Sequence, residues 1–260
     1  MSIYGYFVRG AKHAAMCATS IQSVAKVDHA ATFHVMSDDG TRLPSVPGAR
    51  IHEHDFDSRG APIMIANLEA QVQILGRYAQ LGDRVTFLDT DILMLQPLPF
   101  TLAEDLLVTW RDHVKKDEEG NPIEGIAITM PYNYGVIGAR AGLPAIESFL
   151  WMRERIRRMN PNLQRWYGNQ VALAALCGPR PEEGARLDVR GVPWQPTANG
   201  SAVSIMKLPG ERWNYTPAQV GERIHGTRSV LHFKGHARGL MESYARKLGL
   251  TWHIAEQAAA

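Results

Sequence analysis

One segment constrains this chain more than any other, namely Val85 to Leu93, with the sequence VTFLDTDIL. An apolar, strand-forming run leads directly into two carboxylates, Asp89 and Asp91, and apolar residues resume after them. Alternate side chains of an extended backbone point the same way, so both carboxylates can aim at one point just beyond the strand. Burying two acids is costly unless a metal ion or hydrogen bonds compensate. Because hard divalent cations prefer carboxylate oxygens, the spacing favours a metal site over a polar turn in which one acid caps a helix.

Strands and helices alternate in the segment that precedes these acids. Periodicity predicts, in chain order, strand 3–8, helix 13–27, strands 32–36 and 50–54, helix 64–80 and the strand that ends at Asp89. Strands separated by helices of this length form βαβ units with a mostly parallel sheet. Ligands bind at the carboxyl ends of the strands in such sheets, and Asp89 lies at such an end.

The second half of the chain has a more mixed pattern. It predicts strands over 105–110, 126–130 and 134–137, a charged loop over 115–125, and a helix that Pro144 opens. Taken with the first half, this pattern predicts an α/β fold with a mostly parallel twisted sheet flanked by helices.

A second chemical cluster lies near the C-terminus, where the apolar residues Val230 and Leu231 lead into His232. Imidazole is an acceptable ligand for borderline divalent metals such as Mn²⁺. The residues that follow suit a phosphate group, because a glycine lets backbone approach the phosphate closely and cations neutralise its oxygens. These residues are Lys234, Gly235 and Arg238. A lone histidine near a strand end is usually structural. The prediction that His232 binds a metal therefore depends on its combination with Asp89 and Asp91.

Composition narrows the class of protein. The hydrophobic content of 45% and charged content of 21% are ordinary for a soluble globular protein, and a net charge of +2 provides no argument for nucleic-acid binding. Cys17 and Cys177 are isolated in the sequence, which predicts reduced, buried thiols in a cytoplasmic protein. Arg9 and Lys12 follow a short apolar run, so no secretory signal is expected, and no apolar run is long enough for a transmembrane segment.

With both clusters identified, the chain resembles the GT-A glycosyltransferases, and among them the retaining glycogenin and galactinol-synthase-like family, glycosyltransferase family 8. The segments that carry the resemblance are, in chain order, the D-x-D motif at 88–93, an N-x-G strand at 132–138, Gly168-Asn169-Gln170 where the family has an acid followed by Gln, the W/Y-N segment at 212–214, and the H-x-x-G-x-x-K motif at 232–238. The resemblance implies the GT-A nucleotide-diphospho-sugar transferase fold in a single domain over residues 1–260. Within it, residues 1–100 would form a nucleotide-binding half and residues 101–260 a sugar and acceptor half.

The resemblance also implies a donor and a set of roles. The donor is a nucleoside diphosphate sugar, usually UDP-linked, bound through Mn²⁺ or Mg²⁺. The implied metal ligands are Asp89, Asp91 and His232. The implied donor-binding residues are Phe7 and Val8 beside the base, Asp89 and Thr90 in the D-x-D motif, Asn133 and Gly135 on the sugar side, and Lys234, Gly235 and Arg238 at the diphosphate. The implied catalytic residues are Asp91 and Gln170.

Two positions depart from the family pattern. Asn169 replaces the acid before Gln170, and Arg238-Gly239-Leu240 replaces Lys-Pro-Trp at the end of the last motif. Arg keeps the charge, but its planar fork differs from a lysine ammonium. Because neither Asn169 nor Gln170 supplies a carboxylate nucleophile, retention through front-face attack fits this sequence best. In that mechanism the Gln170 amide oxygen stabilises positive charge at the anomeric carbon.

Alternatives to a glycosyltransferase remain open at this point. A haloacid-dehalogenase-type phosphatase also carries D-x-D after an apolar strand, but there the motif opens the chain, whereas a βαβ unit precedes it here. A non-catalytic nucleotide-sugar-binding protein is the other alternative, in view of Asn169. The acceptor is not identified by the sequence, and candidates are a saccharide, a protein, a lipid-linked saccharide, a polyol or a modified DNA base.

Overall fold

The computed structural model describes residues 2–98, 104–111, 130–178, 192–194, 197–198, 201–219, 222, 224 and 226–253. The charged loop expected over 115–125 lies outside these residues. So does the strand expected over 126–130, except for Met130, which belongs to neither a helix nor a strand.

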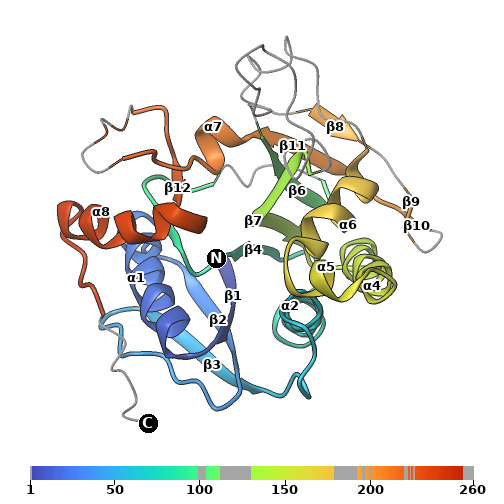
Figure 1. Cartoon of the computed structure of the whole chain (residues 1–260), viewed down its shortest axis with the longest axis horizontal. Helices are drawn as coiled ribbons and strands as arrows, with labels where there is room; N and C mark the ends of the chain where they lie inside the picture. Colours follow the sequence, from blue (N-terminus) through green and yellow to red (C-terminus); the bar gives the residue numbers. More distant parts are fainter. Residues whose placement is uncertain are drawn as a thin grey trace.

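The centre of the molecule is an eight-stranded sheet with the order β3-β2-β1-β4-β7-β6-β11-β8 (Figure 1). The pairs β3–β2, β2–β1, β1–β4 and β6–β11 are parallel, whereas β7 is antiparallel to both of its neighbours and β8 is antiparallel to β11. Among the described strands of this sheet, β7 and β8 therefore run against the others, which confirms the predicted mostly parallel α/β architecture. The strands are β1 Ile3–Arg9, β2 Thr32–Asp38, β3 Arg50–Phe56, β4 Arg84–Leu88, β6 Leu106–Trp110, β7 Tyr132–Arg140, β8 Val192–Trp194 and β11 Ile205–Pro209.

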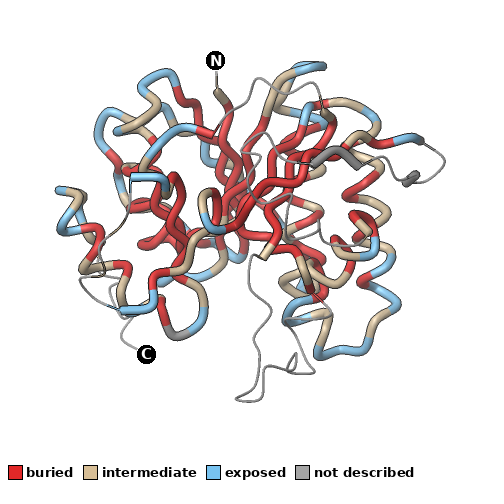
Figure 2. Tube along the Cα trace, turned by 90° about the horizontal axis from the view of Figure 1, so that it is seen from above, coloured by how far each residue is buried: buried red, intermediate tan, exposed pale blue. Residues whose placement is uncertain are grey.

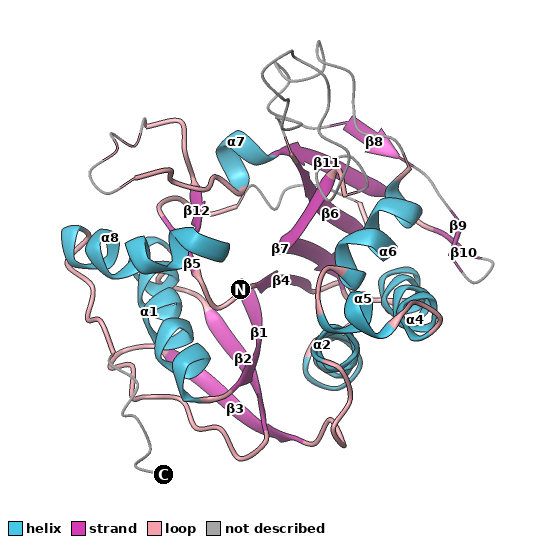
Figure 3. Cartoon of the chain, viewed as in Figure 1, coloured by secondary structure: helices cyan, strands magenta, loops and turns pink. Residues whose placement is uncertain are grey.

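Helices cover both faces of this sheet (Figures 1 and 3). One face carries α1 Ala11–Val27, with α8 Met241–Lys247 beside it. The other face carries α2 Ile63–Gln73, α4 Leu143–Arg157, α5 Pro161–Arg165 and α6 Gly168–Cys177. The remaining described elements are the π-helix Ile74–Tyr78, β5 Ile92–Met94, β9 Thr197–Ala198, β10 Ser201–Ala202, α7 Gly210–Trp213, β12 Val230–His232 and the 3-10 helix Gly235–Leu240.

Several elements differ in extent from the sequence prediction. The helix expected over 64–80 is α-helical only through Gln73 and continues as a π-helix, Ile74–Tyr78. The strand expected over 134–137 extends to Tyr132–Arg140, because its first residues pair with the end of β6 and its last residues pair with the beginning of β4. Asp105 precedes β6 rather than belonging to it. Its Oδ2 accepts hydrogen bonds from the Ser204 backbone N–H (3.0 Å) and hydroxyl (2.7 Å), which joins the beginnings of β6 and β11.

The core follows the alternation of side chains along the strands. On β2, which is buried along its whole length, Phe33 and Val35 pack on the α1 side and Met36 packs on the α2 side. Burial is continuous through the central strands and falls off at the outer turns (Figure 2). Cys17 and Cys177 are free and buried, as predicted. None of the described helices combines the length and hydrophobicity needed to cross a membrane.

The packing of the core between α4 and β4 leads to a prediction about the stability of the protein. Phe149 of α4 is fully buried, and its ring meets the Phe87 ring of β4 edge to face, with the centroids 5.7 Å apart. Phe149→Ala should lower the free energy of unfolding by about 3–5 kcal/mol, because the cavity cannot close against the sheet. Leu143→Ala is the control, since Leu143 begins the same helix but is 62% exposed, and it should change stability by less than about 0.5 kcal/mol. Urea denaturation followed by circular dichroism measures both, and equal losses would contradict this account of the core.

Candidate active site

Two strands outside the main sheet bring the two chemical clusters together. β5 begins immediately after Asp91 and pairs antiparallel with β12, so that Ile92 lies opposite His232. The Phe233 backbone N–H donates to the Asp91 carbonyl oxygen at 2.8 Å. On the other side of the motif, the Asp89 N–H donates to the Gly135 carbonyl at 2.9 Å, which extends the β4–β7 pairing by one residue. Backbone pairing on both sides therefore positions the D-x-D turn.

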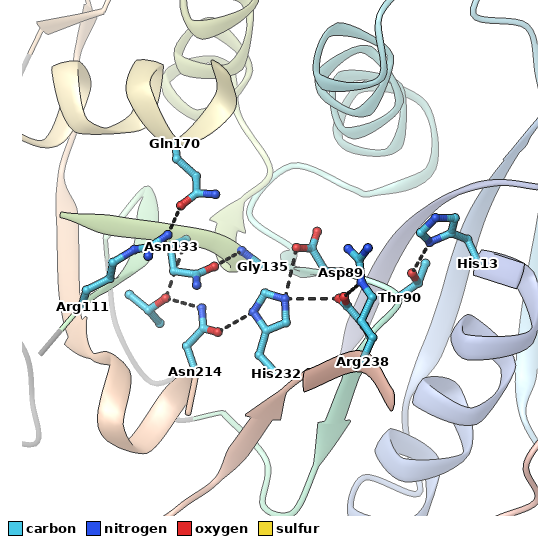
Figure 4. Close-up of polar contacts among 12 residues, drawn as sticks. His13, Asp89, Thr90, Arg111, Asn133, Gly135, Gln170, Asn214, His232 and Arg238 are labelled. Carbon is cyan, nitrogen blue, oxygen red and sulfur yellow. Dashed lines mark hydrogen bonds and ion pairs between the residues drawn. The ribbon is translucent and has the colours of Figure 1, made fainter. Parts of the chain in front are cut away.

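Three potential ligand atoms converge at this turn (Figure 4). His232 Nε2 lies 3.2 Å from Asp91 Oδ1 and 3.5 Å from Asp89 Oδ2, and all three atoms lie within 4.8 Å of one another. The Asp91 and His232 side chains are each 4% exposed, whereas the Asp89 side chain is 39% exposed. The cluster is therefore closed by protein on one side and open to a ligand on the Asp89 side.

Gly135 explains the N-x-G pattern of β7. A Cβ at this position would overlap the His232 ring and press on Asp89 Oδ2. The Asn133 side chain fixes this stretch of backbone, because its Oδ1 accepts a hydrogen bond from the Gly135 N–H at 2.9 Å. The absence of a side chain at Gly135 thus leaves the space that His232 and Asp89 occupy.

Cations surround the acidic pair. Arg238, in the 3-10 helix that follows β12, donates from Nε to Asp91 Oδ2 at 2.7 Å. Gly235 begins that helix with a φ of +59°, a left-handed conformation that glycine adopts without strain. Burial and the neighbouring Arg111 guanidinium lower the pKa of Lys234 to about 7, while Asp89 and Asp91 oppose that shift. Arg238 therefore pairs with Asp91, and Lys234 lies close enough to interact electrostatically with both carboxylates.

The two carboxyl groups respond differently to this environment. Burial and the nearby Asp91 carboxylate raise the pKa of Asp89, while His232, Arg238 and Lys234 oppose that rise. Burial also acts to raise the pKa of Asp91, but His232 and Arg238 outweigh burial and hold that pKa well below its ordinary value. Two carboxylates this close repel each other, and a cation between them would relieve that repulsion.

The donor atoms fit a divalent metal ion. Two carboxylate oxygens and an imidazole nitrogen match the ligand preferences of Mn²⁺ and related ions. In the part of the chain that the structure describes, Asp89, Asp91 and His232 form the one cluster of three or more such side chains with ligand atoms this close together. The geometry of these side chains therefore supports a site for a divalent metal ion.

The region beyond Asn133 contains a residue that the sequence interpretation missed. Arg111 follows the last residue of β6, and its guanidinium donates a hydrogen bond to Gln170 Oε1, which extends from α6 (Figure 4). Burial lowers the pKa of Arg111. The Asn169 side chain is buried, and its Oδ1 accepts from the Gln170 backbone N–H at 2.8 Å. The position of Arg111 at the carboxyl end of a β-strand was the signal that could have revealed it.

The residues predicted beside a base point in different directions. Phe7 contacts Phe56 edge to face, whereas the Val8 side chain is fully buried in the core on the α1 side of the sheet. Only the backbone of Val8 is therefore available at this edge. Thr90 Oγ1 lies 3.2 Å from Nδ1 of His13 on α1, a second residue that the sequence interpretation missed. At the carboxyl ends of β1, β2 and β3, a cavity of about 390 Å³ is lined by Arg9, Asp38, Asp39, Gly40, Phe56, Asp57, Ser58 and Gly60.

The chain is similar to known proteins in its three-dimensional structure but not detectably in its sequence. No protein-family model matches the chain, and no curated protein matches it. Among solved structures, galactosyltransferase LgtC in complex with donor and acceptor sugar analogues is similar over 99% of this chain and 98% of its own, with 17% identity and a TM-score of 0.58. A glycosyltransferase involved in glycosylation of the major capsid of PBCV-1 is similar over 95% of this chain and 98% of its own, with 12% identity and a TM-score of 0.53.

A further similar structure is that of the glycosyltransferase GlyE of Streptococcus pneumoniae TIGR4. The similarity covers 94% of this chain but 60% of GlyE, with 12% identity and a TM-score of 0.52. The chain has the GT-A fold. Identities of this size establish no more than the fold, and they do not assign the chain to glycosyltransferase family 8. In this GT-A fold, the acidic cluster lies at the carboxyl end of β4.

The packing at Gly135 generates a prediction about metal binding. Gly135→Ala should weaken Mn²⁺ binding by about tenfold or more, because the new methyl group must displace His232 or Asp89. Gly76→Ala is a matched control, since a Cβ at Gly76 meets nothing within 4 Å, and it should leave Mn²⁺ affinity unchanged. Titration followed by the electron paramagnetic resonance of free Mn²⁺ measures both affinities. Wild-type affinity in Gly135→Ala would show that this close packing does not shape the cluster.

Proposed function

We propose that this protein is a metal-dependent glycosyltransferase that moves a sugar from a nucleoside diphosphate sugar, UDP-linked, to an acceptor with retention of configuration. The observation that carries the proposal is the convergence of Asp89, Asp91 and His232 at the carboxyl end of a strand in a GT-A fold. The carboxyl edge of a mostly parallel sheet is where such folds bind ligands. That LgtC was solved with donor and acceptor sugar analogues supports a sugar donor here.

The proposed diphosphate site lies between the acids and the cations. Asp89, Asp91 and His232 would hold Mn²⁺ or Mg²⁺, and the bound ion would stabilise negative charge on the departing diphosphate. Lys234 and Arg238 would offset the charge of the remaining phosphate oxygens. Gly235 has no side chain, so the diphosphate can approach the backbone there.

The proposed nucleoside site lies at the ends of β1 and its neighbours. Phe7 and the backbone of Val8 would flank the base, with Thr90 beside the ribose and diphosphate. The cavity of about 390 Å³ at this edge provides room for the nucleoside end of the donor. In this proposal residues 1–100 form the nucleotide-binding half and residues 101–260 the sugar and acceptor half, with Lys234, Gly235 and Arg238 of the second half reaching the diphosphate. Two buried free cysteines support a cytoplasmic location.

The proposed sugar site lies between Gly135 and Gln170, with Asn133 along its side. Neither Asn169 nor Gln170 can act as a carboxylate nucleophile, so retention would proceed by front-face attack. A diphosphate oxygen would then accept the proton of the acceptor hydroxyl. The Gln170 amide oxygen accepts a hydrogen bond from Arg111, so one lone pair remains for positive charge at the anomeric carbon.

A non-catalytic nucleotide-sugar-binding protein is the second candidate, and the neutral Asn169 is the observation that favours it. Both candidates bind the donor with metal, but the enzyme alone hydrolyses or transfers the sugar. The phosphatase alternative is weaker, because the D-x-D motif follows β4 rather than the first strand. The proposal leaves the acceptor open among saccharides, proteins, lipid-linked saccharides and modified DNA bases.

Removal of one ligand charge tests metal dependence. Asp91→Asn should lower the rate of donor hydrolysis by roughly 10² or more, about 3 kcal/mol of transition-state stabilisation, because it removes a charged ligand at similar volume. Asp55→Asn is the control, since the Asp55 side chain is 83% exposed and should not affect turnover. Hydrolysis of UDP-sugars is measured with Mn²⁺ and with chelator. Equal UDP affinity in the two conditions, measured by calorimetry, would contradict the proposed metal dependence.

Substitution of Gln170 tests the proposed chemistry at the sugar. Gln170→Ala should lower turnover strongly with little loss of UDP affinity, because its contact forms mainly in the transition state. Proton NMR of the product from an α-linked donor should show an α-linkage. A β-linked product would refute retention, and a parallel loss of UDP affinity would place Gln170 in ground-state binding instead.

A further inference from the structure

Behind the acidic cluster lies a chain of buried hydrogen bonds that joins β6 to β12. His232 Nδ1 lies 2.7 Å from Asn214 Oδ1, and Asn214 Nδ2 lies 2.7 Å from Thr109 Oγ1. The Thr109 hydroxyl in turn lies 3.2 Å from the Asn133 carbonyl oxygen. Figure 4 shows this chain running from the β7 backbone to the ring of His232. It therefore ends on the side of the imidazole opposite to Asp89 and Asp91.

The direction of this chain follows from the number of hydrogens available. Thr109 has one hydroxyl hydrogen, and it points to the carbonyl of Asn133. Thr109 Oγ1 must then accept from Asn214, which places the NH₂ group of the amide on the Thr109 side. The Asn214 oxygen consequently faces His232, and an oxygen can only accept. The opposite amide orientation would take the Thr109 hydroxyl away from the Asn133 carbonyl.

Burial prevents water from substituting for any member of the chain. Thr109 is 0% exposed, His232 is 3% exposed and Asn214 is 5% exposed. An unsatisfied polar group at this depth costs about 1–3 kcal/mol, so the fully paired arrangement is strongly preferred. The orientation of the Asn214 amide is thus set by its partners.

Backbone structure fixes both ends of this series of hydrogen bonds. A register shift between Val108 and Thr109 interrupts the β6–β7 ladder, and such irregularities re-aim side chains near functional sites. Asn214 follows α7, and its N–H donates to the Gly210 carbonyl at 2.8 Å. The neighbouring Tyr215 carbonyl accepts from the His232 N–H at 2.7 Å, which ties this segment to β12.

We infer that Asn214 is a positioning residue, which together with Thr109 holds His232 in the tautomer that carries its hydrogen on Nδ1. That tautomer leaves the Nε2 lone pair facing Asp89 and Asp91, where a divalent cation needs a ligand. Histidines that bind metals usually donate their other ring N–H to a fixed acceptor, and Asn214 is that acceptor here. The inference rests on the metal site of the proposed function and extends it to residues that touch neither metal nor donor.

The first test measures Mn²⁺ affinity in the absence of nucleotide. Asn214→Leu removes the acceptor at similar volume, and Thr109→Val removes the hydroxyl that orients the amide. Each should weaken Mn²⁺ binding by about 10- to 100-fold. Thr109→Ser restores the hydroxyl and should restore affinity. Thr86→Val is a control for the loss of a buried threonine hydroxyl, because Thr86 Oγ1 on β4 has no hydrogen-bond partner among the described residues.

The second test observes the tautomer directly in the wild-type protein without metal. Long-range ¹H–¹⁵N correlation of the His232 ring should show hydrogen on Nδ1, whether or not Nε2 also carries one toward Asp91, which lies 3.2 Å away. This measurement needs neither turnover nor a correctly folded variant. It therefore separates failure of the inference from failure of the proposed function, since a protein that transfers no sugar still reports its His232 tautomer.

Each outcome of these two tests either supports or overturns the inference. Hydrogen on Nδ1, together with weak Mn²⁺ binding in Asn214→Leu and Thr109→Val but not in Thr109→Ser or Thr86→Val, supports the inference. A His232 ring without hydrogen on Nδ1 in the wild-type protein overturns it, as does wild-type Mn²⁺ affinity in both Asn214→Leu and Thr109→Val. If the wild-type protein bound no Mn²⁺ but carried hydrogen on Nδ1, the positioning role would stand and the proposed metal site would fail.

Discussion

The pairing of β5 with β12 is the constraint on which the rest of the site depends. The D-x-D turn and the C-terminal histidine are distant in sequence, and the antiparallel pairing of Ile92 with His232 places them side by side. Three apolar residues of these strands and the following segment, Leu93, Leu231 and Phe233, are buried in a cluster with α8. The hydrophobic stabilisation of that cluster therefore also holds the polar residues together. The packing of the chain itself, rather than a ligand, therefore brings the site together.

The site also depends on the balance of charge around Asp89 and Asp91. Two carboxylates share one small volume, and partners act on them unequally, so the pKa of Asp91 falls while that of Asp89 rises. Arg238 bonds directly to Asp91, and Asp89 faces the open side. The cluster therefore presents its less stabilised charge to an incoming ligand. A cation at this position and an anionic diphosphate beyond it would alternate in sign with the protein groups on either side.

Much of the fold was predictable, because buried strands and amphipathic helices leave periodic patterns in the sequence. Asp89 and Asp91 were visible because acids rarely interrupt an apolar run. Arg111 was not recognised, although the strand predicted over 105–110 ends immediately before it. Alternation along β1 already implied that Phe7 and Val8 face opposite sides of the sheet. Contacts such as that between Thr109 and Asn214 join residues 105 positions apart, and no local pattern predicts them. The π-helical turn after Gln73 likewise left no periodic signal.

In the proposed site, Asp89, Asp91 and His232 hold one divalent cation at the diphosphate of a nucleotide donor. Anomalous diffraction from crystals soaked with Mn²⁺ and UDP tests this arrangement most directly, because it locates the metal without reference to activity. One anomalous peak is expected within coordination distance of these three side chains and of the diphosphate oxygens. A peak elsewhere, or UDP bound at this edge of the sheet with no metal beside it, would show that these side chains do not hold the metal at the donor.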